Sequence, residues 1–164
     1  KTKKGVTMLM QDQIAQDLAK AKNLLGSASL IAVKGDQVWQ REGRGIRPLF
    51  DLITALGETL HAAVLADVVV GKAAALLAVY AGFRAVHART LSGPALNVLK
   101  SHGVRVSYDI LTERILNHDQ TGFCPMEMLT HNIENPAAAY AAIATKLKEF
   151  RNSKIKGETQ YGER

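Results

Sequence analysis

The apolar segment ADVVVGKAAALLAVYAG, residues 66–82, contains two charged side chains, Asp67 and Lys72. Lys72 follows Gly71 near the expected start of a helix, where free backbone N–H groups and an ammonium group could together hold an anion. A lysine whose stem packs on the helix while its ammonium reaches water explains Lys72 equally well. Asp67 could also serve a ligand, but we favour its interpretation as the cap of this helix, which requires no functional role.

A Gly-Phe-Cys-Pro turn at residues 122–125 presents a further candidate, Cys124. A catalytic thiol needs a base, and the nearest histidines in the sequence, His118 and His131, are not at a spacing that implies contact. Packing as a small buried hydrophobic residue is the simpler interpretation of Cys124. Glu127 falls in the first turn of a short helix that opens at Cys124, where it could bind a ligand or only interact with the helix dipole.

Metal and cofactor sites are not expected. The five histidines are scattered, and no two of them have the i, i+3 or i, i+4 spacing that helical metal ligands share. The segment GRGIR at residues 43–47 could grip a phosphate at a helix start, but an exposed turn explains it as well.

The secondary structure that must position these side chains follows from the apolar pattern. Periodic apolar residues predict a first helix from Met8 to Leu25, and Gly35-Asp36 suits a tight turn between two strands. We then expect helices at residues 47–56, 67–81 and 93–102, alternating with strands at residues 61–66, 83–91 and 104–110. This order predicts an α/β fold with one mixed five-stranded sheet, helices on both faces and parallel strands at its centre.

One domain is expected over residues 1–150, because a chain of this length can enclose a single core. Asn135 followed by Pro136 marks the start of a last helix, which we expect to end near Phe150. Residues 151–164 contain almost nothing to bury and predict a flexible basic C-terminal tail.

The net charge of +6 lies in the two ends of the chain. Residues 1–4 carry three lysines and residues 146–164 carry six basic and three acidic residues, whereas residues 5–145 hold twelve of each sign. Composition therefore gives no case for nucleic acid as a partner of the folded part. No apolar run approaches the roughly 20 residues that cross a bilayer, so no membrane partner is expected. A single cysteine suits a reducing, cytoplasmic environment.

Three short motifs carry a family resemblance: VVGKAAALL at residues 69–77, SGPALNVL at residues 92–99 and TGFCPMEML at residues 121–129. In this order and spacing they resemble the prokaryotic domain-of-unknown-function family 1893, over roughly residues 29–143. The resemblance implies the cytidine deaminase-like fold, in which three layers are arranged α-β-α.

Zinc deaminases of that fold place His or Cys, then Ala-Glu, at the first helix start and Pro-Cys-x-x-Cys at the second. Three nitrogen or sulfur ligands hold the zinc there, and the glutamate moves protons. Residues 67–74 of this chain offer no His, Cys or Glu. Pro94 matches the second motif, but Ala95 and Val98 occupy its cysteine positions. The resemblance therefore implies a protein that is not a zinc-dependent deaminase, and it leaves open whether the chain is an enzyme.

The vacated crevice is the expected place for a ligand. Open α/β sheets bind ligands beyond the carboxyl ends of their strands, which here means near Lys72 and Ser92. We expect a small anionic metabolite or nucleotide-like ligand, over which residues 121–127 could close. The full set of candidate ligand-binding residues is Asp67, Gly71, Lys72, Ser92, Cys124 and Glu127, with Cys124 as the candidate catalytic residue. The alternative is a non-catalytic interaction module, such as a homodimer formed through helices or a sheet edge.

Overall fold

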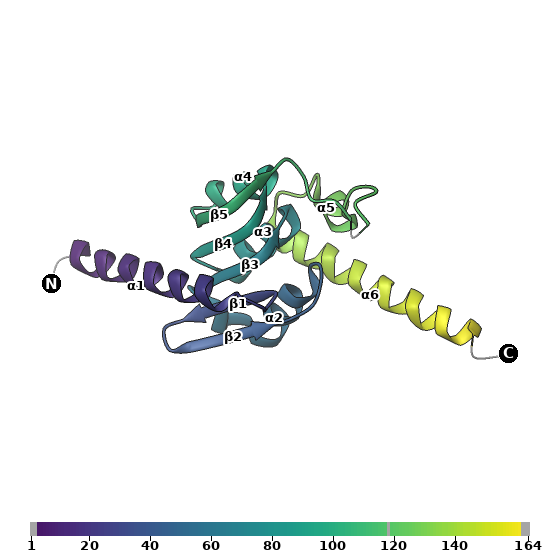
Figure 1. Cartoon of the computed structure of the whole chain (residues 1–164), viewed down its shortest axis with the longest axis horizontal. Coiled ribbons are helices and arrows are strands. Elements are labelled where there is room, and N and C mark those ends of the chain that lie inside the picture. The colour runs from purple at the N-terminus through teal and green to yellow at the C-terminus, as the bar shows by residue number, and fades with distance from the viewer. Residues whose placement is uncertain (1–2, 118, 162–164) are drawn as a thin grey trace.

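A five-stranded mixed sheet forms the centre of the molecule in the computed structural model, which describes residues 3–117 and 119–161, with side chains up to residue 155 (Figure 1). The strands are β1 (Leu30–Lys34), β2 (Gln37–Arg41), β3 (Val64–Val70), β4 (Ala85–Ser92) and β5 (Arg105–Thr112). They lie in the order β2-β1-β3-β4-β5. β1 pairs antiparallel with β2 and β3, whereas β3, β4 and β5 are parallel.

Helices cover both faces of this sheet. α1 (Lys3–Leu24) packs on one face, against β1, β3 and β4. The other face carries α2 (Arg47–Leu56), a 3-10 helix (Gly57–Leu60), α3 (Lys72–Ala81), α4 (Gly93–Ser101), α5 (Pro125–Thr130) and α6 (Pro136–Tyr161). The α/β class, the mixed five-stranded sheet and the helices on both faces are confirmed.

Small and branched aliphatic side chains build the interior. α3 is buried from residue 72 to residue 78, because its alanines let it lie close to the sheet, α4 and α6. Three aromatic rings join the outer helices: Phe50 and Tyr80 each stack on Tyr140, with ring centroids 5.1 and 4.4 Å apart. These contacts link α2, α3 and α6 into one layer over the sheet.

The boundary between β3 and α3 differs from the sequence prediction. β3 continues through Asp67 to Val70, where the sequence predicts a helix, because the last residues of β3 pair in parallel with β4. Three successive valines favour this extended conformation. α3 begins at Lys72, with Gly71 as its N-cap residue. The interpretation of Asp67 as a helix cap is therefore wrong.

The two terminal helices are longer than the sequence predicts. α1 begins at Lys3 rather than Met8, and α6 continues past Phe150 to Tyr161. Lysine, arginine and glutamate support a helix without needing burial, which explains how α6 extends through a basic segment. The division into one domain and a flexible tail stays a prediction, and residues 162–164 lie outside the described part of the chain.

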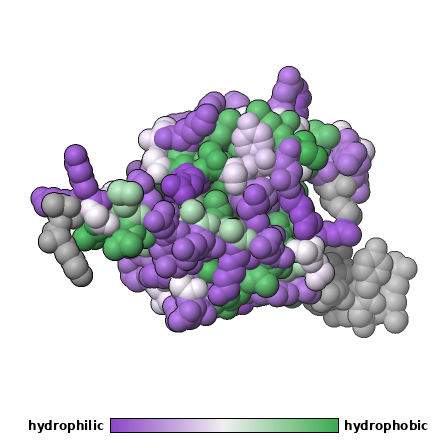
Figure 2. Space-filling model, turned by 60° about the vertical axis from the view of Figure 1, so that its left-hand side comes forward, coloured by the Kyte–Doolittle hydropathy of each residue, from purple (hydrophilic) through white to green (hydrophobic). Residues whose placement is uncertain are grey.

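The outer halves of α1 and α6 project beyond the body of the molecule (Figure 1). The projecting half of α1 exposes Val6, Met8, Leu9 and Met10, and Figure 2 shows apolar surface beside the N-terminal end of this helix. No helix in the described ranges is long and apolar enough to cross a bilayer.

Candidate functional site

A crevice of about 800 Å³ opens beyond the carboxyl end of β3. Six parts of the chain line it: the α1–β1 connection, the loop before α2 with the start of that helix, the β3–α3 junction, β4, the segment around α5, and α6. Of the six residues that the sequence nominates, four line this crevice and two do not. Those in the wall are Asp67, Gly71, Cys124 and Glu127, and those outside it are Lys72 and Ser92.

Asp67 brings an acidic group to the crevice from the central strand β3. Its carboxylate is half-buried, and its Oδ1 accepts a hydrogen bond from the backbone N–H of Val69 at 3.4 Å. Burial raises the pKa of Asp67 to about 7, although the backbone N–H groups of Val69 and Val68 act in the opposite direction. Near neutral pH this carboxyl group can therefore both accept and donate a proton. A pKa in this range is expected of a carboxyl group that takes part in binding or catalysis.

Glu127 occupies the N-terminus of α3. Its Oε2 accepts a hydrogen bond from the N–H of Lys72 at 2.9 Å, and its Oε1 accepts one from the N–H of Ala73 at 3.1 Å. Gly71 permits this approach, since a Cβ atom at residue 71 would collide with the Glu127 carboxylate. The chain's own carboxylate thus takes the position at which a helix N-terminus binds an anion.

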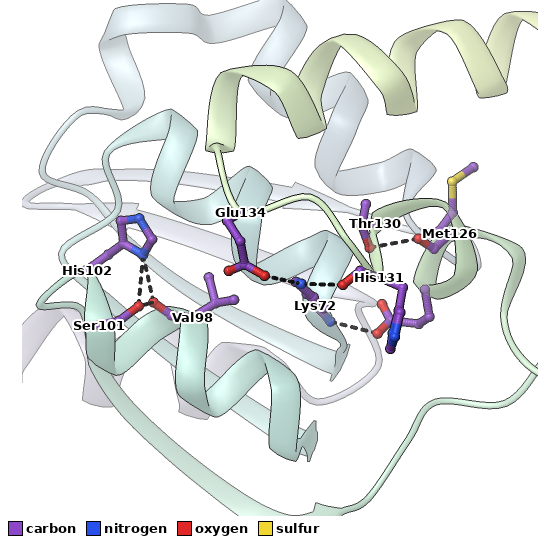
Figure 3. Close-up of polar contacts among 9 residues, drawn as sticks. Lys72, Val98, Ser101, His102, Met126, Thr130, His131 and Glu134 are labelled. Atoms are coloured by element: carbon purple, nitrogen blue, oxygen red, sulfur yellow. Dashed lines mark hydrogen bonds and ion pairs between the residues drawn. The ribbon is translucent and has the colours of Figure 1, made fainter.

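The Lys72 side chain points away from the crevice lining. The residue is 8% exposed, and its Nζ donates to the carbonyl oxygen of His131 at 2.8 Å and to Oε1 of Glu134 at 2.9 Å (Figure 3). The hydrogen bond and charge of Lys72 lower the pKa of Glu134. Lys72 therefore ties α3 to the connection between α5 and α6, and it is not the solvated lysine of the simpler interpretation.

Ser92 caps the second helix start. Its Oγ accepts a hydrogen bond from the N–H of Ala95 at 3.2 Å, and the residue is fully buried. Ala95 and Val98, at the positions where the deaminase motif has cysteines, belong to the apolar core. Residues of α4 contribute no lining to the crevice, and Pro94 at the helix start is exposed elsewhere on the surface.

Cys124 lies in the crevice wall as the N-cap residue of α5, and it is half-buried. Its backbone is fixed on both sides, with the N–H bonded to Ile115 and the carbonyl oxygen to the N–H of Met128. His131 is exposed at the end of α5, and His118 lies outside the described residues. A nucleophilic role of Cys124 stays a prediction.

Arginines line the same crevice. Arg44 and Arg47 come from the loop and helix start at residues 43–47, one of the segments that the sequence suggests could bind a phosphate. Arg89 of β4 also lines it, and its Nη2 donates to the carbonyl oxygen of Gly26 at 2.9 Å. Sequence reasoning did not single out Arg89. A signal that could have identified Arg89 is that it is the one arginine or lysine within the strand AVHARTLS.

A second polar cluster joins His87, Ser107 and Asp109. The Nδ1 of His87 lies 2.8 Å from Oγ of Ser107, and its Nε2 lies 3.6 Å from Oδ1 of Asp109. The residue types match a nucleophilic triad, but none of the three lines the crevice or a smaller cavity of about 190 Å³ near His61. This geometry supports a structural role for His87, with Nδ1 hydrogen-bonded to Ser107 and Nε2 near the Asp109 carboxylate.

We expect His87 to contribute to stability in a way that is lost as the pH drops below the ordinary histidine range. Burial lowers the pKa of His87, Lys22 lowers it further, and Asp109 partly offsets both. A folded pKa below the unfolded value means that the unfolded state binds the proton first, so the contribution of His87 is retained above about pH 6.5 and is lost below it. Urea unfolding of the wild type and of His87→Gln over this range should show this contribution as a stability difference that changes as the pH falls. An unchanged pH profile in His87→Gln would contradict this assignment.

Among the described residues, no three His, Cys, Asp or Glu side chains are grouped closely enough to hold a metal ion. The crevice offers a ligand acidic and basic side chains, serine and asparagine groups and one thiol, set among apolar side chains.

The family model described as "Domain of unknown function (DUF1893)" matches residues 19–147. The chain is similar to the crystal structure of a DUF1893 family protein (TM1506) from Thermotoga maritima, with 26% sequence identity and a TM-score of 0.74, over 80% of this chain and 90% of that one. It also matches a diaminohydroxyphosphoribosylaminopyrimidine deaminase/5-amino-6-(5-phosphoribosylamino)uracil reductase from the same organism, with 17% identity and a TM-score of 0.38, over 75% of this chain and 41% of that one. A TM-score of 0.38 at 17% identity supports no inference about activity. The search of curated proteins found no match.

Proposed function

The chain belongs to the DUF1893 family, a family of domains of unknown function, and we propose that it binds a small anionic, nucleotide-like ligand in the crevice beside Asp67. The observation that carries this proposal is the crevice itself, which combines a half-buried carboxyl group with arginines from separate elements. Its volume of about 800 Å³ lies in the range of ligand sites. Its position, beyond the carboxyl end of a parallel strand, is where open α/β sheets bind ligands.

The arginines would hold the anionic part of the ligand. A guanidinium group presents a planar fork of N–H donors that matches phosphate and carboxylate geometry. Arg47 belongs to the first turn of α2 and Arg89 to β4, so the two groups reach the crevice from different sides of its wall. This moves the expected anion position from Lys72, which does not line the crevice, to Arg47 and Arg89, which do. The Arg47 Nη2 also donates to the carbonyl oxygen of Leu147 at 3.4 Å, and the five N–H donors of a guanidinium group leave others for a ligand.

Asp67 would bind the uncharged polar part of the ligand. Because its pKa is near 7, its carboxyl group can donate to a ring nitrogen or accept from an amino or hydroxyl group. Glu127 is the other carboxylate in the wall, but its oxygens are engaged by the N–H groups of Lys72 and Ala73. A nucleotide-like molecule, with a phosphate at one end and a polar ring at the other, satisfies both requirements.

Ligand titration with two arginine variants tests the proposal. Nucleoside 5′-monophosphates and sugar phosphates would be screened by thermal shift, and the best stabilising compound measured by calorimetry. Arg47→Met and Arg89→Met should each weaken its binding about 5- to 30-fold, the scale for losing a charge-assisted hydrogen bond. Arg84→Met is the matched control, since Arg84 is exposed at the opposite end of β4 and does not line the crevice.

The control variant should bind like the wild type. If no compound in the screen stabilises the wild type, or if Arg84→Met weakens binding as much as the crevice variants do, the proposal is wrong.

A further inference from the structure

β5 is an edge strand of the sheet, and several of its apolar side chains are exposed to solvent. Tyr108, Ile110 and Leu111 are 42%, 61% and 47% exposed. β4 pairs with one edge of β5, and no strand in the described ranges pairs with its other edge. Over eight residues, β5 therefore presents a row of unpaired backbone N–H and C=O groups beside exposed apolar surface.

This edge has few of the features by which proteins usually block strand pairing. It contains no proline and no lysine, it is longer than a short protected edge, and its two charged side chains, Arg105 and Asp109, have opposite signs. The opposite edge strand, β2, spans five residues, three of which are polar. The two edges of the sheet thus differ, and β5 is the one suited to accept a further strand.

The side chains of β5 divide between two faces. Ser107 and Asp109 both reach His87, so they lie on the same face of the sheet. Arg105, two residues before Ser107, shares that face because side chains alternate along a strand. Val106 and Tyr108 lie on the other face, which carries α4. The face with His87 therefore holds one cation and one anion, four residues apart on the edge strand.

The four-residue spacing of Arg105 and Asp109 favours a second copy of the chain as the partner and one register of strand pairing. If two copies pair through β5 about a twofold axis perpendicular to the sheet, residues opposite each other must lie on the same face. With Ser107 opposite its own copy, Arg105 of each chain lies opposite Asp109 of the other, and Val106 lies opposite Tyr108. If Asp109 of one copy lay opposite Asp109 of the other, like charges would meet. If Tyr108 lay opposite Tyr108 of the other copy, Arg105 of each chain would lie opposite Leu111 and lose its ion pair.

We propose that two copies of this chain associate through antiparallel pairing of their β5 strands, centred on Ser107, to form one continuous ten-stranded sheet. Two Arg105–Asp109 ion pairs and two Val106–Tyr108 contacts fix the register. The charge pattern makes a second copy the favoured occupant, because the edge is complementary to itself. This surface is separate from the crevice, whose lining includes no residue of β5.

Charge reversal at the edge tests the proposal with the full-length chain. Sedimentation velocity over a concentration series would give the dimer dissociation constant of the wild type. Arg105→Asp and Asp109→Arg each convert two attractive pairs into two repulsive ones and should raise that constant about tenfold or more. The double variant restores both pairs in reversed order and should return it to within about threefold of the wild type.

A disulfide reports the register directly. In a Cys124→Ser background, Ser107→Cys should form an intermolecular disulfide on mild oxidation, because opposite residues of antiparallel strands have Cα atoms about 4.5–5.5 Å apart. Thr112→Cys in the same background is the control, since the proposed register separates its two copies by about ten residues of strand and forbids a bond.

Rescue by the double variant and cross-linking at residue 107 would support the proposal. A wild type that stays monomeric at all concentrations would overturn it. So would a dimer that is indifferent to both reversals, or one that is lost only when the chain is truncated to remove residues 1–10. Melting temperatures of all variants would exclude unfolding as the cause, because Arg105 and Asp109 are exposed.

Discussion

Replacing Asp67 with asparagine should stabilise the unliganded protein by about 2 kcal/mol at about pH 8. Burial raises the pKa of this carboxyl group from 3.8 to about 7. The folded state therefore binds the Asp67 proton more tightly than the unfolded state does, and the contribution of this group to stability is lost as the pH rises from about 4 to about 7. An amide of the same shape does not ionise, so the advantage of Asp67→Asn should grow through this window and level off above it.

Urea unfolding at about pH 4.5, 6 and 8 measures this difference. Asp51→Asn, on the surface of α2 with its side chain 54% exposed, serves as the matched control and should show no comparable trend. If Asp67→Asn is destabilising at pH 8, or if its effect is the same at each pH, the account of Asp67 is wrong.

The same substitution should weaken ligand binding about tenfold, because an amide cannot exchange the proton that the carboxyl group shares with a polar ring. A residue whose replacement stabilises the fold but impairs binding is retained for function rather than for stability. That combination would distinguish Asp67 from a structural carboxylate.

Gly71→Ala should destabilise the protein by about 2 kcal/mol, the scale for losing hydrogen bonds to a charged group. The added Cβ would collide with the Glu127 carboxylate and push it away from the N–H groups of Lys72 and Ala73. The backbone of Gly71, with φ −97° and ψ −174°, is open to any residue, so the cost comes from the contact and not from backbone strain.

A double-mutant cycle with Glu127→Ala isolates this contact. In the Glu127→Ala background, Gly71→Ala should cost only the few tenths of a kcal/mol that alanine loses to glycine as an N-cap residue. Chemical unfolding of the four proteins gives the coupling. If the losses in unfolding free energy of the two single variants add up in the double variant, residue 71 does not need to be glycine to accommodate Glu127. The interpretation that the Glu127 carboxylate occupies an anion site at the N-terminus of α3 would then be wrong.

Much of the fold could be predicted because its signals are local. The glycines at 26, 57, 82 and 103 follow helices, and strands come between one such glycine and the next helix, so the order of elements follows from the sequence. Ser92 and Pro94 mark the start of α4 within one turn, and the Ser92 hydroxyl indeed caps that helix. The boundary of β3 could not be predicted in this way, because pairing with β4 decides where the strand ends.

The contacts within the candidate site depend on residues that are distant in sequence. Glu127 reaches the start of α3 from 55 residues away, and Lys72 bonds Glu134 from 62 residues away. No spacing rule connects such pairs, so the sequence nominates Lys72 as an anion ligand although its ammonium group is engaged elsewhere. Asp67 was nominated for its charge, whereas its raised pKa arises from burial that only the packed sheet provides.

The most direct test of the central claim is to map a ligand on the protein by NMR. Nucleoside 5′-monophosphates would be added to ¹⁵N-labelled wild type and the backbone amide shifts followed to saturation. Binding in the crevice predicts saturable shifts at residues 43–47, at residues 67–71 and at Arg89, with little change along β5. Shifts that do not saturate, or that cluster away from these three segments, would contradict the claim that this crevice is the binding site.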